Sequence, residues 1–241
     1  MTTFGLVHGA WHGGWCWQYL IPELEARGHR AVAMDLPTED PQAGAEGYAA
    51  IVRRALDSFD EDVVLVGHSL AGLTIPVVAS LRPVRHLIYL CAIIPRPGAA
   101  WDDVAAEQPP FGHYQSSTPA VGHPDGSASC PEERAVELFY HDCPADRARW
   151  AAGLLRRQNW RVSQEITPLA AFPDVPASSI LCTGDRVVDP AWSRAAAQGV
   201  LGVRPIELSG GHSPFLAQPA RLADVLHGLA TDSRRASGCS T

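Results

Sequence analysis

Short apolar runs alternate with amphipathic segments along most of the chain. The runs are rich in β-branched and large aliphatic residues, which is typical of buried strands. They lie at residues 4–7, 30–34, 63–66, 86–90, 178–183 and 205–208. After most of them, apolar residues recur at helical spacing, at residues 17–28, 48–59, 70–80, 190–198 and 222–229. Strands that alternate with helices predict an α/β fold with a mostly parallel sheet and helices on both faces.

The alternation breaks in the middle of the chain. Residues 96–170 are rich in proline, glycine and aromatic residues, with helix starts expected at Pro131 and Pro144. Because strands resume afterwards, we expect a helical insertion into a core made of residues 1–95 and 171–231. The small and polar residues 232–241 predict a disordered tail.

A strand, a tight turn and a helix meet at Ser69. The apolar residues 63–66 run into Gly67, and a helical pattern follows the serine. This is the pattern of a nucleophile elbow, whose strained turn keeps the serine hydroxyl clear of its neighbours. The usual Gly-x-Ser-x-Gly is altered here, because Ala71 takes the last position and Gly72 follows. An ordinary strand–turn–helix with a capping serine is the alternative interpretation.

Ser69, Asp185 and His212 each come directly after a predicted strand. The carboxyl ends of parallel strands meet at one edge of a sheet, so we expect the three side chains to lie together. A serine needs a base to remove its proton, and the base needs a carboxylate to orient it. We therefore predict a catalytic triad of these residues. Asp189 is expected instead to cap the helix that begins at Pro190.

The oxyanion donors are expected to be the backbone N–H groups of Ala10 and Leu70. Gly9 and the small Ala10 permit close approach of the backbone to a substrate oxygen, although a simple tight turn is the alternative reading. Aromatic residues near the predicted site indicate an apolar acyl or aryl substrate, and packing within the insertion is the alternative for any one of them. The expected substrate contacts are Trp11, His68, Phe111 and Phe215, with Trp101, Tyr114 and Phe139 as further candidates.

Composition excludes several other classes of protein. The net charge is −7, and basic residues cluster no further than arginine pairs such as Arg234-Arg235, which argues against nucleic acid and anionic membrane partners. The chain contains no lysine, so a Walker A loop and a lysine Schiff base are excluded. His8 and His12 lack the H-E-x-x-H pattern, and no G-x-G-x-x-G is present. We therefore expect no metal and no cofactor.

Targeting features are also missing from the sequence. No apolar run reaches the roughly 18 residues that span a bilayer, and the N-terminus enters a strand at once, so we expect no signal peptide. The six cysteines are scattered without a C-x-x-C pair, which favours a reducing cytoplasm.

Four segments together resemble the α/β-hydrolase superfamily. They are residues 6–17, 67–70, 185–186 and 211–212, which read LVHGAWHGGWCW, GHSL, DR and GH. The pattern is most similar to the small plant methyl-ester esterase and hydroxynitrile lyase group and its bacterial relatives, and it covers nearly the whole chain. The resemblance implies an α/β-hydrolase fold with a six-stranded, mostly parallel sheet and a helical cap, here residues 96–170.

The resemblance also separates the branches of that group. The lyases have threonine at the position of Gly9 and lysine at the position of Ser213, so the esterase branch is implied. Relatives that cleave epoxides or haloalkanes place aspartate at the elbow, where this chain has Ser69.

We therefore expect a cofactor-independent serine hydrolase, a monomer or homodimer, that cleaves a small to medium apolar ester through an acyl-enzyme. The alternatives are a thioesterase, lactonase or acyltransferase in secondary metabolism, or a ligand-binding protein that retains the fold.

Overall fold

A six-stranded sheet in the order β2-β1-β3-β4-β7-β8 forms the centre of the computed structural model, which describes residues 1–59 and 62–238. Its strand pairs are all parallel. The strands are β1 (Thr3–Val7), β2 (Arg30–Ala33), β3 (Val63–His68), β4 (His86–Leu90), β7 (Ala177–Cys182) and β8 (Ile206–Leu208). Each coincides with a predicted apolar run to within a few residues, so the parallel α/β architecture is confirmed.

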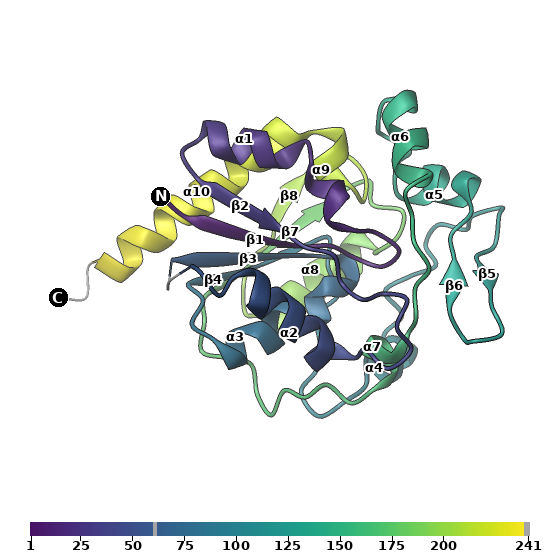
Figure 1. The fold of residues 1–241 in the computed structure, drawn as a ribbon, viewed down its shortest axis with the longest axis horizontal. Helices are drawn as coiled ribbons and strands as arrows, with labels where there is room; N and C mark the ends of the chain where they lie inside the picture. Colours follow the sequence, from purple (N-terminus) through teal and green to yellow (C-terminus); the bar gives the residue numbers. More distant parts are fainter. Residues whose placement is uncertain (60–61, 239–241) are drawn as a thin grey trace.

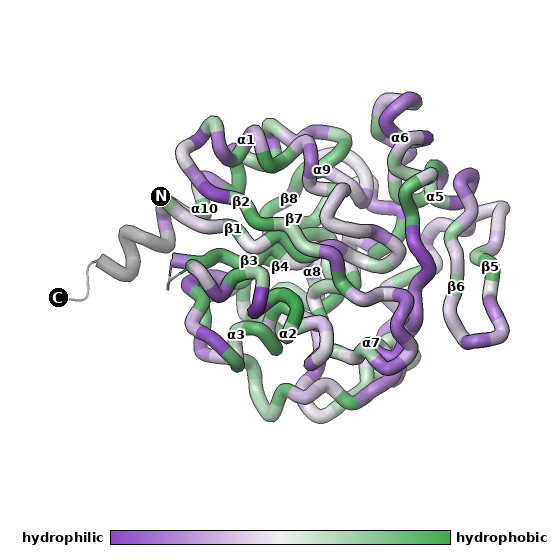
Figure 2. Tube along the Cα trace, in the orientation of Figure 1, coloured by the Kyte–Doolittle hydropathy of each residue, from purple (hydrophilic) through white to green (hydrophobic). Residues whose placement is uncertain are grey.

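Helices cover both faces of this sheet, as predicted (Figure 1). One face carries α1 (Leu20–Ala26) and α10 (Pro219–Gly238), and the other carries α2 (Ala45–Ala55), α3 (Ile75–Leu81) and α8 (Pro190–Gly199). Side chains that alternate along the strands build two separate apolar clusters, one under each helical layer. Figure 2 shows the most hydrophobic part of the chain in the strands between these layers.

The helix predicted after Ser69 is divided in two. A short 3₁₀ helix, η2 (Ser69–Leu73), leads into α3. Pro76 explains the break, because it has no N–H to donate and its ring would clash with the carbonyl four residues earlier. It fits within the first turn of α3, where no such donor is needed.

The segment expected to form a cap lies beyond the carboxyl ends of the strands, away from the N-terminus (Figure 1). Two of its helices follow Pro131 and Pro144, as predicted. Its elements are α4 (Trp101–Glu107), the hairpin of β5 (Val121–Gly122) and β6 (Ala128–Ser129), α5 (Glu132–Leu138), α6 (Ala145–Ala152) and α7 (Arg161–Gln164). The boundaries that separate cap from core stay a prediction.

The end of the chain differs from the expectation of disorder from residue 232. Helix α10 continues to Gly238, and residues 239–241 lie outside the described residues. Leu222, Leu226 and Ala230 are buried and hold one face of the helix against the core. Once a helix has formed, each further residue adds a hydrogen bond without the cost of starting a new helix. None of the described helices is both long and apolar enough to cross a bilayer.

Candidate active site

Ser69 lies at the turn between β3 and η2 with a backbone φ of +53°. This left-handed conformation is strained for a residue with a side chain, as an elbow requires. The turn is held close to the chain that leaves β4, since Ile93 N–H donates to the Ser69 carbonyl at 3.2 Å. A Cβ at Gly72 would overlap the Ile93 carbonyl oxygen, whereas Ala71 is accommodated. The glycine that this elbow needs is therefore Gly72.

His212 and Asp185 form a buried hydrogen-bonded pair. Asp185 follows β7, His212 follows β8, and the imidazole Nδ1 donates to Asp185 Oδ2 at 2.8 Å. The two side chains are 2% and 3% exposed. The other carboxylate oxygen accepts from the N–H groups of Val187 and Val188 at 2.8 and 3.0 Å. These bonds fix the Nδ1–H tautomer of His212 and leave Nε2 free to act as a base.

The imidazole of His212 is placed beside the elbow by His68. The two rings are 4.6 Å apart between centroids, and His68 Nε2 donates to the His212 carbonyl at 3.0 Å. Burial lowers the pKa of His68 well below its usual value, so this neighbour stays neutral when a charge forms on His212. Among the described residues, Ser69 and His212 make no direct hydrogen bond. In free enzymes such bonds are often long and tighten when substrate binds.

The predicted oxyanion residue Ala10 lies in a loop that packs against the serine. A Cβ at Gly9 would lie 2.8 Å from the Ser69 Cβ. His8 Nε2 accepts from the Leu36 N–H at 2.9 Å, so its Nδ1 carries the proton and donates to the Gly9 carbonyl at 2.9 Å. In a trans peptide the N–H points opposite to the C=O. Anchoring the Gly9 oxygen therefore fixes the direction of the Ala10 N–H.

A second imidazole anchors the next peptide of the same loop. His12 Nδ1 donates to the Ala10 carbonyl at 2.7 Å, and His12 Nε2 accepts from the Tyr140 hydroxyl at 2.8 Å. Burial lowers the pKa of His12 to about 3, which keeps the ring neutral and able to make both bonds. The sequence analysis missed Tyr140, which lies 128 residues from His12 and carries no local motif.

A cavity of about 390 Å³ opens over the elbow. Ser69 and both predicted oxyanion residues, Ala10 and Leu70, line it. Its walls are mostly aromatic and apolar, with Trp11, Phe111, Tyr114, Leu138, Phe139 and Trp160 among them. Four of the aromatic residues expected at the site therefore do line the cavity.

Three other aromatic candidates lie elsewhere. His68 and Phe215 are fully buried and pack against each other at 4.8 Å between ring centroids, so they do not line the cavity. Trp101 packs edge-on against Trp192. His68 thus supports the His212 ring rather than facing a substrate.

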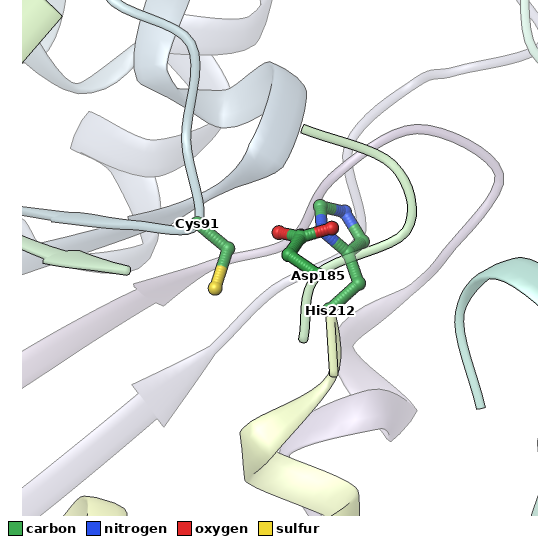
Figure 3. A group of neighbouring side chains, drawn as sticks. All are labelled: Cys91, Asp185 and His212. Carbon is green, nitrogen blue, oxygen red and sulfur yellow. The ribbon is translucent and has the colours of Figure 1, made fainter. Parts of the chain in front are cut away.

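Cys91 lies next to the acid–base pair. Its sulfur, an Asp185 oxygen and a His212 nitrogen lie within 4.8 Å of one another, and Figure 3 shows the three side chains side by side. A hydrogen bond with Cys182 and burial raise the pKa of the Cys91 thiol well above its usual value. A protonated thiol is a poor metal ligand. The carboxylate already holds the imidazole, so the cluster has the chemistry of a triad rather than of a metal centre.

Two arginines also line the cavity and were given no role from the sequence. Arg186 directly follows Asp185, and Arg134 comes from α5. Arg186 belongs to the DR segment of the family resemblance, which gave it no binding role, and Arg134 belongs to no local motif.

Comparisons with known proteins agree with this geometry. Methylesterase 3 of Arabidopsis thaliana is 36% identical over 92% of this chain and 93% of its own length. The α-hydroxynitrile lyase of the same plant is 25% identical, with 95% and 97% covered. The crystal structure of a pyrethroid hydrolase from Sphingobium faniae JZ-2 superimposes with a TM-score of 0.80 at 25% identity, covering 95% of this chain and 97% of that one. These relatives confirm the resemblance to the methyl-ester esterase and hydroxynitrile lyase group.

The alpha/beta hydrolase family model matches residues 6–225, which include the elbow, the acid and the histidine. The chain belongs to the alpha/beta hydrolase family.

Proposed function

We propose that this chain is a serine ester hydrolase in which Ser69 is the nucleophile, His212 the base and Asp185 the orienting acid. The observation that supports these roles most directly is the buried His212–Asp185 hydrogen bond of 2.8 Å beside a serine with φ of +53°. The prediction of an ester hydrolase is confirmed by relatives whose names describe ester hydrolysis, a methylesterase and a pyrethroid hydrolase.

The reaction follows from the positions of these groups. Ser69 Oγ attacks the ester carbonyl while His212 Nε2 takes its proton, and the imidazolium is stabilised by Asp185. The N–H groups of Ala10 and Leu70 hold the oxyanion, and each donor of this kind contributes about a hundredfold or more to the rate. His212 then protonates the leaving alcohol. Water activated by the same imidazole releases the acid and restores the serine.

The lining of the cavity supports a small-molecule ester with an apolar body. For the compartment we propose a reducing one such as the cytoplasm. The support is that the six cysteines are scattered along the sequence without a C-x-x-C pair.

The test compares the wild type with Ser69→Ala and with the control Ser80→Ala, whose hydroxyl bonds within α3. Each protein is assayed with a p-nitrophenyl ester, a thioester and a lactone, and is treated with a fluorophosphonate. We expect the ester to be the best substrate, with activity lower by at least about a thousandfold in Ser69→Ala alone. A covalent adduct should form at Ser69. Equal ester hydrolysis by the two variants, or no adduct, would overturn the proposal.

A further inference from the structure

The charged groups in the cavity are of one sign. Among its described lining residues, Arg134 and Arg186 are the charged ones, and the remainder are apolar or neutral polar. Two cations would not help a pocket to bind neutral esters, and each of them costs free energy because it must be partly desolvated there. The hydrogen bonds of the two guanidinium groups show which of their N–H donors the protein itself already uses.

Arg186 is held in place but keeps unused donors. Its guanidinium lies over the ring of Tyr114 at 4.5 Å from the centroid, and Nη1 donates to the Glu137 carbonyl at 3.0 Å. In the described part of the chain, Nε and Nη2 make no hydrogen bond and no carboxylate lies within ion-pair distance of this arginine. The side chain is therefore pre-oriented with donors available to a ligand.

Arg134 is similar. Its Nη1 donates to the Thr118 carbonyl at 2.8 Å, while the buried Nε has no partner among the described residues. Within the same residues it forms no ion pair. Arg134 as a whole is half-buried, and an unpaired donor at a buried atom is unfavourable unless something else supplies an acceptor.

The nearby carboxylates are already engaged with other groups. Glu137 accepts from the hydroxyls of Ser116 and Tyr114 at 2.6 and 3.1 Å. The bond from Ser116 and, to a smaller extent, the charge of Arg186 hold the pKa of Glu137 below the usual range, so this carboxylate balances part of the arginine's charge from a distance. It does not line the cavity. Asp185 is buried and bonded to His212. Neither acid faces the cavity. A carboxylate on the substrate would therefore meet arginine donors that no acidic side chain of the cavity lining already holds.

Resting on the function proposed above, we propose that the natural substrate carries a free carboxylate in addition to the ester, as in the half-ester of an aliphatic dicarboxylic acid. The planar fork of arginine matches a carboxylate in charge and in geometry. The aromatic and aliphatic walls of the cavity contact the hydrocarbon chain between the two ends of such a molecule. Arg134 and Arg186 are then specificity-determining residues for the hydrolase reaction.

The test uses two matched series of methyl esters, in which methanol is the common product. Monomethyl succinate, glutarate, adipate and suberate are compared with the methyl esters of monocarboxylic acids of the same chain length. The proteins are the wild type, Arg134→Met, Arg186→Met and Arg186→Lys. The control is Arg149→Met, which alters an exposed arginine of α6 outside this cavity.

In the wild type we expect a higher kcat/KM for the half-ester at the best chain length. Each Met variant should lower the ratio of half-ester to neutral kcat/KM by about tenfold, mainly through KM. The kcat/KM of the neutral series should fall much less than that of the half-esters, and Arg186→Lys should lie between the wild type and Arg186→Met. Added salt should reduce the preference. The control should match the wild type.

The inference is overturned if the wild type prefers the neutral esters at every length, or if the Met variants change both series equally. In those cases the Ser69-dependent hydrolysis of neutral esters still stands, so the proposed function is judged separately. Should a Met variant fail to fold, competitive inhibition of the wild type decides instead. A free dicarboxylate should inhibit about tenfold more strongly than the monocarboxylate of equal length, and equal inhibition would refute the inference.

Discussion

Replacing Tyr140 by phenylalanine removes one hydroxyl from the support of the oxyanion loop. The hydroxyl donates to His12 Nε2 at 2.8 Å, and both residues are 1% exposed, so water cannot replace the lost bond. Burial raises the pKa of Tyr140 and lowers that of His12, so the bond joins two neutral groups throughout the neutral range. Leaving a buried acceptor unpaired costs about 1–3 kcal/mol, which is the expected loss in free energy of unfolding.

The same change should affect catalysis more than binding. The His12 ring holds the Ala10 carbonyl at 2.7 Å, and without the Tyr140 hydroxyl the ring is free to tilt. This carbonyl belongs to the peptide that follows the Ala10 N–H, which His8 orients through the Gly9 carbonyl, so the donor is displaced only indirectly. Complete loss of an oxyanion donor lowers kcat by about a hundredfold to a thousandfold. Misalignment of one donor should therefore lower kcat by about tenfold. The KM of a neutral ester should change little, because its ground state does not use that donor. Affinity for a boronic acid, which mimics the tetrahedral intermediate, should fall in parallel with kcat.

The matched control is Tyr89→Phe. Tyr89 lies on β4, is fully buried, and its hydroxyl has no hydrogen-bond partner among the described residues. Its removal should leave stability and activity close to the wild type, because no bond is lost. Urea denaturation and steady-state kinetics measure both effects. If Tyr140→Phe behaves like Tyr89→Phe in both assays, the reasoning about the loop is refuted.

Three further outcomes are expected. Asp185→Asn should lower kcat about ten-thousandfold with little effect on folding. Asp189→Ala should keep activity but lower the free energy of unfolding by about 1 kcal/mol. The reason is that Asp189 caps α8 by accepting a 2.7 Å hydrogen bond from the Ala191 N–H. Gly72→Ala should destabilise the fold by about 3 kcal/mol or more in urea denaturation, since the new Cβ overlaps the backbone at Ile93. Acidification should destabilise the protein through His12, whose pKa is lowered from 6.5 to about 3 by burial. The unfolded chain binds that proton first, so stability falls below pH 6.5, by about 2 kcal/mol at pH 5. The slope should be shallower in His12→Gln than in the control His227→Gln, which alters an exposed histidine.

The sheet and the proposed triad could be predicted because their determinants are local. A fully buried parallel strand is a continuous apolar run, and the residue after it must lie at one edge of the sheet. Ser69, Asp185 and His212 therefore could be grouped without any knowledge of their distances. Asp189 was assigned to a helix cap on the same grounds, and its side chain does accept from the N–H of Ala191.

Features that depend on contacts distant in sequence were not predictable. The bond between Tyr140 and His12 spans 128 residues, and neither residue has a neighbour that indicates it. The exclusion of Phe215 from the cavity depends on how its ring packs against Trp17 and His68. The short elements of residues 96–170 are set by mutual packing rather than by periodicity, because a helix of four to eight residues carries too few positions to show a period.

The loop that carries Ala10 is held by the core on one side and by the insertion on the other. Trp11, the next residue, has a strained φ of +63°. Its N–H, indole N–H and carbonyl all bond to residues 128–158, namely to Gln158 at 3.2 Å, Ala128 at 3.0 Å and Arg156 at 2.7 Å. A cap that moved away as a rigid lid would break these bonds and release the oxyanion loop. We therefore expect substrate to enter where the wall is less tightly held, beside Phe111, which lines the cavity and is 48% exposed.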